Sequence, residues 1–145
     1  MKLNRVLLCL GLALSAFSMW DTLGHSWDPA FQAPALSLGK THTQYHAFRE
    51  FTLSVGAAAV LLYVMFLPSA QRMRSLWTVM CVTAVCYFGG WWLPGPVLGL
   101  YAPNRAATFV HLSATILCLT SVFLAWSYFF RLQTVQLGND DCCSV

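Results

Sequence analysis

Four largely apolar segments, all without Asp, Glu, Lys or Arg, most constrain what this chain can fold into. They span residues 6–20, 51–68, 76–93 and 106–130. A membrane-spanning helix needs about 20 apolar residues, and the last three segments approach or exceed this length. Charged residues make up only 9% of the 145 residues, against roughly 25% in soluble domains. We therefore expect an all-α, polytopic membrane protein: a single domain, residues 1–145, folded as a four-transmembrane-helix bundle.

The first segment allows two interpretations. Lys2 and Arg5, followed by a short apolar run and small residues, are typical of a secretory signal that is cleaved. However, Trp20 lies where an interfacial aromatic anchor belongs, and the two basic side chains can reach the membrane surface and lengthen the span. We favour a retained first helix.

The basic residues predict the orientation of the spans. With the N-terminus in the cytoplasm, that side holds five of the eight Lys and Arg residues and the other side holds three. This excess favours cytoplasmic N- and C-termini in a plasma or inner membrane, an outer loop over 21–40 and a cytoplasmic tail over 132–145. The chain has no basic stripe with interleaved aromatic residues, which argues against nucleic-acid binding.

Capping and breaking residues set the expected helix boundaries. Thr41 is a plausible N-cap, and no Gly or Pro follows it until Gly56, so the second helix is expected to begin well before its apolar run. Asn104 is the expected N-cap of the last helix. The Gly- and Pro-rich residues 89–103 are expected to form a loop at the membrane surface. The expected helices span residues 6–20, 41–68, 76–93 and 105–130.

Histidine and glutamate side chains cluster at the outer ends of two spans. His42, His46 and Glu50 are spaced i, i+4 and i+8, which places them on one helical stripe. His111 lies about 10 Å into the last span, a depth comparable to that of His46 and Glu50. We expect these groups to meet if the two helices are neighbours. His111 also heads a stripe that suits an inward, close-packing face, formed by Thr115, Cys118, Ser121 or Val122, and Ala125.

The outer loop adds further candidate ligands. All four histidines fall on the predicted non-cytoplasmic side, and imidazole with carboxylate suits copper, zinc or iron. With an open coordination position, such a site would permit metal-assisted oxidation or hydrolysis. Asp28 is also a good turn residue before Pro29. The predicted ligands are His25, His42, His46, Glu50 and His111, with Asp21 and Asp28 as weaker candidates.

One part of this pattern resembles a known family. Asp21, His25 four residues further on, an extended loop and then a histidine at the start of a span resemble the membrane C subunit of particulate methane and ammonia monooxygenases. The resemblance covers about residues 20–63, under a third of the chain. It implies copper bound at the outer face by Asp21, His25 and either His42 or His46.

Other functions remain open from the residues alone. His46 and His111 on facing spans would suit the two axial positions of a haem in an electron carrier. Alternatively, the polar groups satisfy one another, or Glu50 pairs with Arg49 or Arg105. The protein would then be a non-catalytic assembly subunit, partnered by other membrane subunits or a second copy, or a carrier of a small apolar molecule. A His and Glu pair would also suit acid–base chemistry on a lipid, so enzymatic activity is left open.

Overall fold

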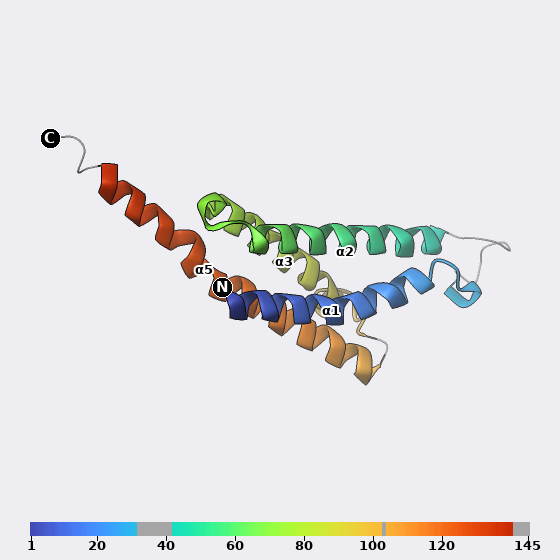
Figure 1. The fold of residues 1–145 in the computed structure, drawn as a ribbon. Helices are drawn as coiled ribbons and strands as arrows, with labels where there is room; N and C mark the ends of the chain where they lie inside the picture. The colour runs from blue at the N-terminus through green and yellow to red at the C-terminus, as the bar shows by residue number, and fades with distance from the viewer. Residues whose placement is uncertain (32–41, 103, 141–145) are drawn as a thin grey trace.

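A computed structural model describes residues 1–31, 42–102 and 104–140, without the side chains of Phe31, His42 and residues 131–140. No β-strand occurs in these ranges, and the predicted all-α fold is confirmed. The elements are α1 (Lys2–Gly24), η1 (Pro29–Phe31), α2 (His42–Phe66), η2 (Ser69–Gln71), α3 (Arg74–Trp92), α4 (Pro94–Leu98) and α5 (Arg105–Asp140) (Figure 1).

The four long helices form a bundle in which each packs mainly on two others. α5 packs on α1 and α3, and α2 packs on the same two helices, so α2 and α5 lie diagonally across the bundle. Figure 1 shows α5 crossing α1 obliquely and its last turns projecting beyond the other helices. This arrangement decides which side chains can meet, because a residue on α5 reaches α1 and α3 more readily than α2.

We name the two ends of the bundle by their side chains. At the histidine end, α1 and α3 end and α2 and α5 begin, and this end holds His25, His46 and His111. At the arginine end, α2 ends, η2 leads into α3, and Arg5, Arg72 and Arg74 are found. The predicted placement of the histidines at one end therefore appears in the fold, and three of the five arginines with described side chains lie at the other end, while Arg49 and Arg105 lie at the histidine end.

The helices α1 and α5 pack closely through residues spaced alternately by four and three positions. On α5 the buried residues include Cys118, Ser121, Val122 and Ala125, which confirms the predicted inward stripe. The Ser121 hydroxyl donates to the Asn4 carbonyl at 2.6 Å, and the Asn4 amide donates to the Ser121 carbonyl at 3.4 Å. Small residues allow the two backbones to approach, and the reciprocal hydrogen bonds fix their register.

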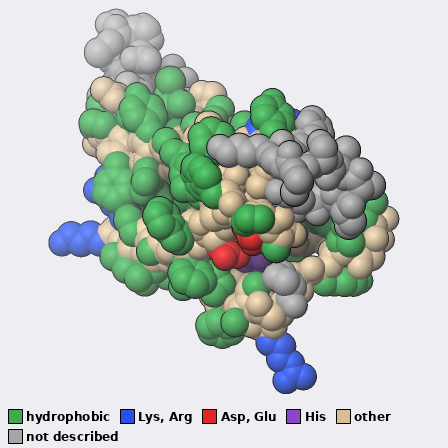
Figure 2. Space-filling view, turned by 90° about the vertical axis from the view of Figure 1, so that its right-hand side faces the viewer, with side chains coloured by type: hydrophobic (Ala, Val, Ile, Leu, Met, Phe, Trp, Pro, Cys, Tyr) green, Lys and Arg blue, Asp and Glu red, His purple; other side chains and the backbone are tan. Residues whose placement is uncertain are grey.

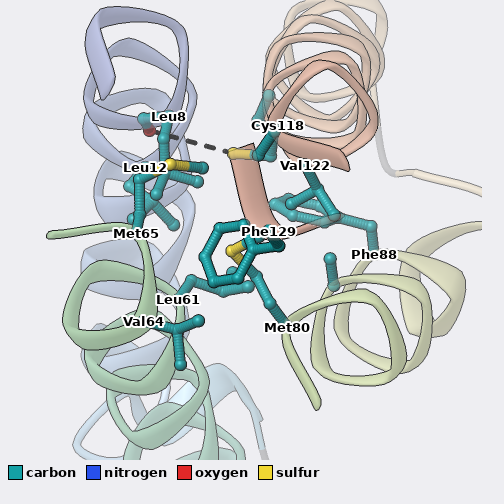
Figure 3. Close-up of a cluster of buried hydrophobic side chains, with 13 residues drawn as sticks. Leu8, Leu12, Leu61, Val64, Met65, Met80, Phe88, Cys118, Val122 and Phe129 are labelled. Carbon is teal, nitrogen blue, oxygen red and sulfur yellow. Dashed lines mark hydrogen bonds between the residues drawn. The ribbon is translucent and has the colours of Figure 1, made fainter. Parts of the chain in front are cut away.

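The apolar core lies between the four helices toward the arginine end. Leu61 and Met65 of α2 face Met80 of α3, and Phe129 of α5 lies between them (Figure 3). These four side chains are completely buried. Further buried core residues are Leu8, Leu12, Val64, Ala84, Phe88, Ala114, Cys118, Val122 and Ala125.

Three of the described helices are long and apolar enough to cross a membrane. They are α1, the part of α2 from Thr43 to Phe66, and the part of α5 from Arg105 to Phe130. α3 has 19 residues and is not among these three. The structure is therefore compatible with an integral membrane protein.

Several boundaries differ from expectation. α1 is longer at both ends than the expected span, and α5 continues as helix to Asp140, where a tail from residue 132 was expected. The expected surface loop contains α4, which ends at Gly99 with a φ of 71°, a conformation that suits glycine. The N-cap prediction at Asn104 is confirmed, because its side chain accepts from the Ala107 amide at 2.8 Å. Thr41 lies outside the described residues.

Candidate functional site

Four of the seven predicted site residues line two pockets at the histidine end. The first, which we call the α1–α5 pocket, has a volume of about 180 Å³. It brings together three predicted ligands, Asp21, His25 and His111. Figure 2, which faces this end of the bundle, shows carboxylate and imidazole groups side by side. The other lining residues are Phe17, Ser18, Thr22, Ala107 and Val110.

His111 is held in this pocket by two neighbouring helices. Its Nε2 lies 3.0 Å from the Ser18 hydroxyl of α1, and its ring stacks on Trp91 of α3 with centroids 4.3 Å apart. One turn further along α5, the Thr115 hydroxyl donates to the His111 carbonyl at 2.7 Å. The imidazole is thus oriented by α1 and α3, and not by α2.

Asp21 and His25 form the acidic side of the same pocket. The Asp21 Oδ2 lies 4.0 Å from the His25 Nε2, and the pair is ionic only when the imidazole is protonated. Their side chains are 75% and 38% exposed, so water screens the interaction. The pair can therefore rearrange around a ligand at little cost in stability.

The second pocket lies between α2 and α3, and we call it the α2–α3 pocket. Its volume is about 450 Å³, and Glu50 supplies its carboxylate. Tyr87 also lines it and shares a hydrogen bond of 2.6 Å between its hydroxyl and that of Ser15 on α1. The remaining lining residues are Leu53, Ser54, Ala57, Thr83, Cys86, Gly90 and Trp91.

Trp91 connects the two pockets. Its indole lines the α2–α3 pocket and also stacks on His111, which lines the α1–α5 pocket. The ring of Tyr87 lies 5.4 Å from that of Trp91, between centroids. Aromatic side chains therefore stand between Glu50 and His111.

The expected meeting of His111 with His46 and Glu50 is not seen. The diagonal placement of α2 and α5 explains this, since α1 and α3 fill the space between them. Within residues 1–31, 42–102 and 104–140, no group of three or more His, Cys, Asp or Glu side chains is placed to hold a metal ion. The side chain of His42 lies outside the described part of the chain.

The other candidates have local roles. Asp28 accepts from the Ala30 amide at 2.8 Å, the turn role that its position before Pro29 suggests. His46 is exposed and contacts Tyr45 edge-on, with ring centroids 5.6 Å apart. Glu50 forms no ion pair with any side chain that the structure describes, so its expected pairing with Arg49 or Arg105 is absent there.

Sequence reasoning missed the partners that α1 and α3 contribute. Ser18 and Trp91 contact His111, and Ser15 bonds to Tyr87. A signal for the α1 residues was present, because Asn4, Leu8, Gly11, Ser15 and Ser18 follow the same alternation of four and three positions as the α5 stripe. Because the same spacing occurs on both helices, it predicts that α1 and α5 pack through these faces.

Comparison of the chain with protein-family models, with curated proteins and with solved structures gives no match. The resemblance to the monooxygenase subunit therefore stays a prediction from the sequence.

Proposed function

We propose that this chain is a non-catalytic membrane protein that binds a small apolar ligand with a cationic group in the α2–α3 pocket. The observation that carries this proposal is the composition of the pocket. One carboxylate, Glu50, stands in a largely apolar groove together with the aromatic rings of Tyr87 and Trp91.

The size of the pocket supports a small organic ligand. Its volume of about 450 Å³ falls within the range of roughly 300–1,000 Å³ that is usual for such sites. Leu53, Ala57 and Cys86 provide apolar contacts for the body of the ligand. The pocket lies between only two helices, so an apolar molecule can enter it from the surrounding lipid.

The charge of the pocket supports a cation. Glu50 has no ion-pair partner among the described side chains, so its carboxylate remains available to a ligand. The faces of Tyr and Trp rings attract organic cations, and quaternary ammonium groups in particular. A carboxylate beside two such rings therefore favours an ammonium group over a neutral or anionic one.

The membrane arrangement that we propose has four spans with the arginine end in the cytoplasm. α3 is taken as the fourth span because it packs between α2 and α5 and is about 28 Å long at 1.5 Å per residue. The excess of basic residues favours this orientation. Retention of α1 is supported by its buried core residues Leu8, Leu12 and Ser15. Both pockets then lie toward the non-cytoplasmic side.

Replacing Glu50 with glutamine tests the proposed function. The substitution keeps the size of the side chain but removes its charge, and we expect the affinity for benzyltriethylammonium to fall about tenfold. Quenching of tryptophan fluorescence in the detergent-solubilised protein measures this affinity, since Trp91 lines the pocket.

The Asp28→Asn variant is the matched control for charge. Asp28 is a carboxylate at the same end of the bundle but does not line the pocket. We expect this variant to bind the cation as the unaltered protein does. Equal loss of affinity in both variants, or no binding to the unaltered protein, would reject the proposal.

A second candidate function, a transition-metal site, is favoured by one observation. Asp21, His25 and His111 line a common pocket, and their donor atoms suit copper, zinc or iron. These three side chains are not placed to hold a metal ion as they stand, so they would have to move closer together, and the His111 imidazole would exchange its contact with Ser18 for the metal.

Metal analysis and a visible spectrum of the purified protein test this candidate. A metal site predicts a stoichiometric transition metal that is lost in the His111→Ala variant but kept in His46→Ala. Bound haem, the alternative with His46 and His111 as axial ligands, predicts a Soret band that both substitutions abolish. Absence of metal and of a Soret band from protein with intact histidines would reject both.

A further inference from the structure

Two arginines converge on the C-terminus of α2 at the arginine end. Arg5 of α1 donates from Nε to the Met65 carbonyl at 3.4 Å, and its guanidinium lies over the Phe66 ring at 4.7 Å from the centroid. Arg72, which follows η2, donates from Nη2 to the Leu67 carbonyl at 2.8 Å. Both side chains are half-buried, so their guanidinium groups are held by the fold.

The positive charge of this pair is not balanced by the protein that surrounds it. The C-terminus of a helix carries about half a negative charge, which offsets only a fraction of two guanidinium charges. No carboxylate forms an ion pair with either arginine in the part of the chain whose side chains are described. A net positive charge of roughly 1.5 is left at the end of α2.

Arg72 also has an unused hydrogen-bond donor. Its Nε is buried and has no hydrogen-bond partner among the described atoms. A buried donor without a partner costs about 1–3 kcal/mol, more when the group is charged. Partial burial, together with repulsion from Arg5, lowers the pKa of Arg72 from its usual value. The repulsion would be relieved by an anion beside the two guanidinium groups.

We propose that Arg5 and Arg72 form a binding site for a phosphate group, supplied by the headgroup of an anionic membrane lipid. A guanidinium presents its N–H donors in a plane that matches two phosphate oxygens. The phosphate would accept from donors of Arg72 that do not contact Leu67 and from donors of Arg5 that do not contact Met65.

The position of the pair in the fold favours a lipid as the source of the phosphate. The two arginines lie where α2, a helix that can cross a membrane, ends at Phe66. This is the depth of the lipid headgroups. Phe66 is exposed beside Arg5, so the acyl chains of the same lipid can pack along the outside of α2. The proposal is independent of the ligand in the α2–α3 pocket.

Native mass spectrometry of the full chain in a non-ionic detergent tests the proposal. We expect dioleoylphosphatidylglycerol to bind more tightly than the zwitterionic dioleoylphosphatidylcholine. The Arg72→Gln variant should weaken binding of the anionic lipid about fivefold and remove most of this preference. Arg72→Lys, which keeps the charge but loses the planar fork, should have an intermediate affinity.

Arg74→Gln is the matched control, because it removes the same charge from the same end. Arg74 is exposed and lies over the Phe130 ring instead of on the end of α2. Equal weakening by Arg72→Gln and Arg74→Gln would overturn the proposal in favour of general attraction between charges. The proposal would also be overturned if the Arg72→Gln variant keeps the helical circular-dichroism spectrum and binds the anionic lipid with unchanged affinity.

Sodium phosphate distinguishes the two sources of the phosphate group. If the inorganic ion fails to displace the lipid, the site belongs to the lipid headgroup, as we propose. If the ion displaces the lipid in the unaltered protein and does not bind the Arg72→Gln variant, the phosphate site is supported and its ligand is a soluble anion.

Discussion

Replacing Gly11 with valine is expected to separate α1 from α5 and to lower the free energy of unfolding by about 3 kcal/mol. A Cβ atom at this position would collide with the Cys118 Sγ and would lie 3.1 Å from both the Ala114 carbonyl oxygen and the Leu117 Cβ. Two of these three atoms belong to the backbone or to its first side-chain carbon, so they can move only with the helix. Unfolding in mixed SDS and non-ionic micelles, followed by circular dichroism, measures the change.

The Gly56→Val variant provides the matched control. Gly56 also lies inside a long helix, α2, but a Cβ there would meet nothing within 4 Å. We expect its stability to stay the same or to rise slightly, since valine has the better helix propensity. In Gly11→Ala, the additional Cys118→Ala change should restore part of the lost stability. An equal loss in Gly11→Val and Gly56→Val would contradict close packing at Gly11.

Replacing Phe129 with alanine is expected to lower the free energy of unfolding by about 3 kcal/mol. The Phe129 side chain is completely buried among residues of all four long helices, including Leu8, Leu61 and Met80 (Figure 3). Its removal leaves a cavity that the surrounding helices can close only in part. The value lies at the low end of the usual range, because lipid gives a weaker drive for apolar burial than water does. The same unfolding measurement applies.

Phe123→Ala is the control for this prediction. Phe123 is on the same helix, but 74% of it is exposed, so its removal leaves no internal cavity. We expect its effect on unfolding to be several-fold smaller. Similar destabilisation by the two substitutions would show that α5 does not present its Phe129 face to the core.

The two stability predictions also concern the pockets. Gly11 allows the close approach of α1 and α5 that brings Ser18 to His111 and Asp21 and His25 into the same pocket. A Gly11→Val variant that still folds should therefore lose any metal bound at this pocket. Glu50 and Tyr87 lie between α2 and α3, and cation binding there should be affected less.

The sequence predicted which residue types lie at the candidate site and at what depth, but not which of them are neighbours. The spacing of His42, His46 and Glu50 predicted a common helical stripe, and the position of His111 predicted a similar depth. Depth follows from the rise of 1.5 Å per residue and needs no knowledge of neighbours. Which helices are neighbours depends on the packing of whole faces, so the separation of His111 from Glu50 by Trp91 could not be read from spacing.

The sequence by itself determined that the chain is helical, that its long helices are apolar, that the histidines lie toward one end and that basic residues are in excess at the other. These properties depend on the residue composition and on the spacing of residue types within each helix, which do not depend on the neighbouring helices. The tertiary structure alone decided that α2 lies diagonal to α5, because that choice depends on the match between the small residues of α1 and those of α5. That match places Asp21 and His25 with His111, and leaves Glu50 in a separate pocket with Tyr87 and Trp91.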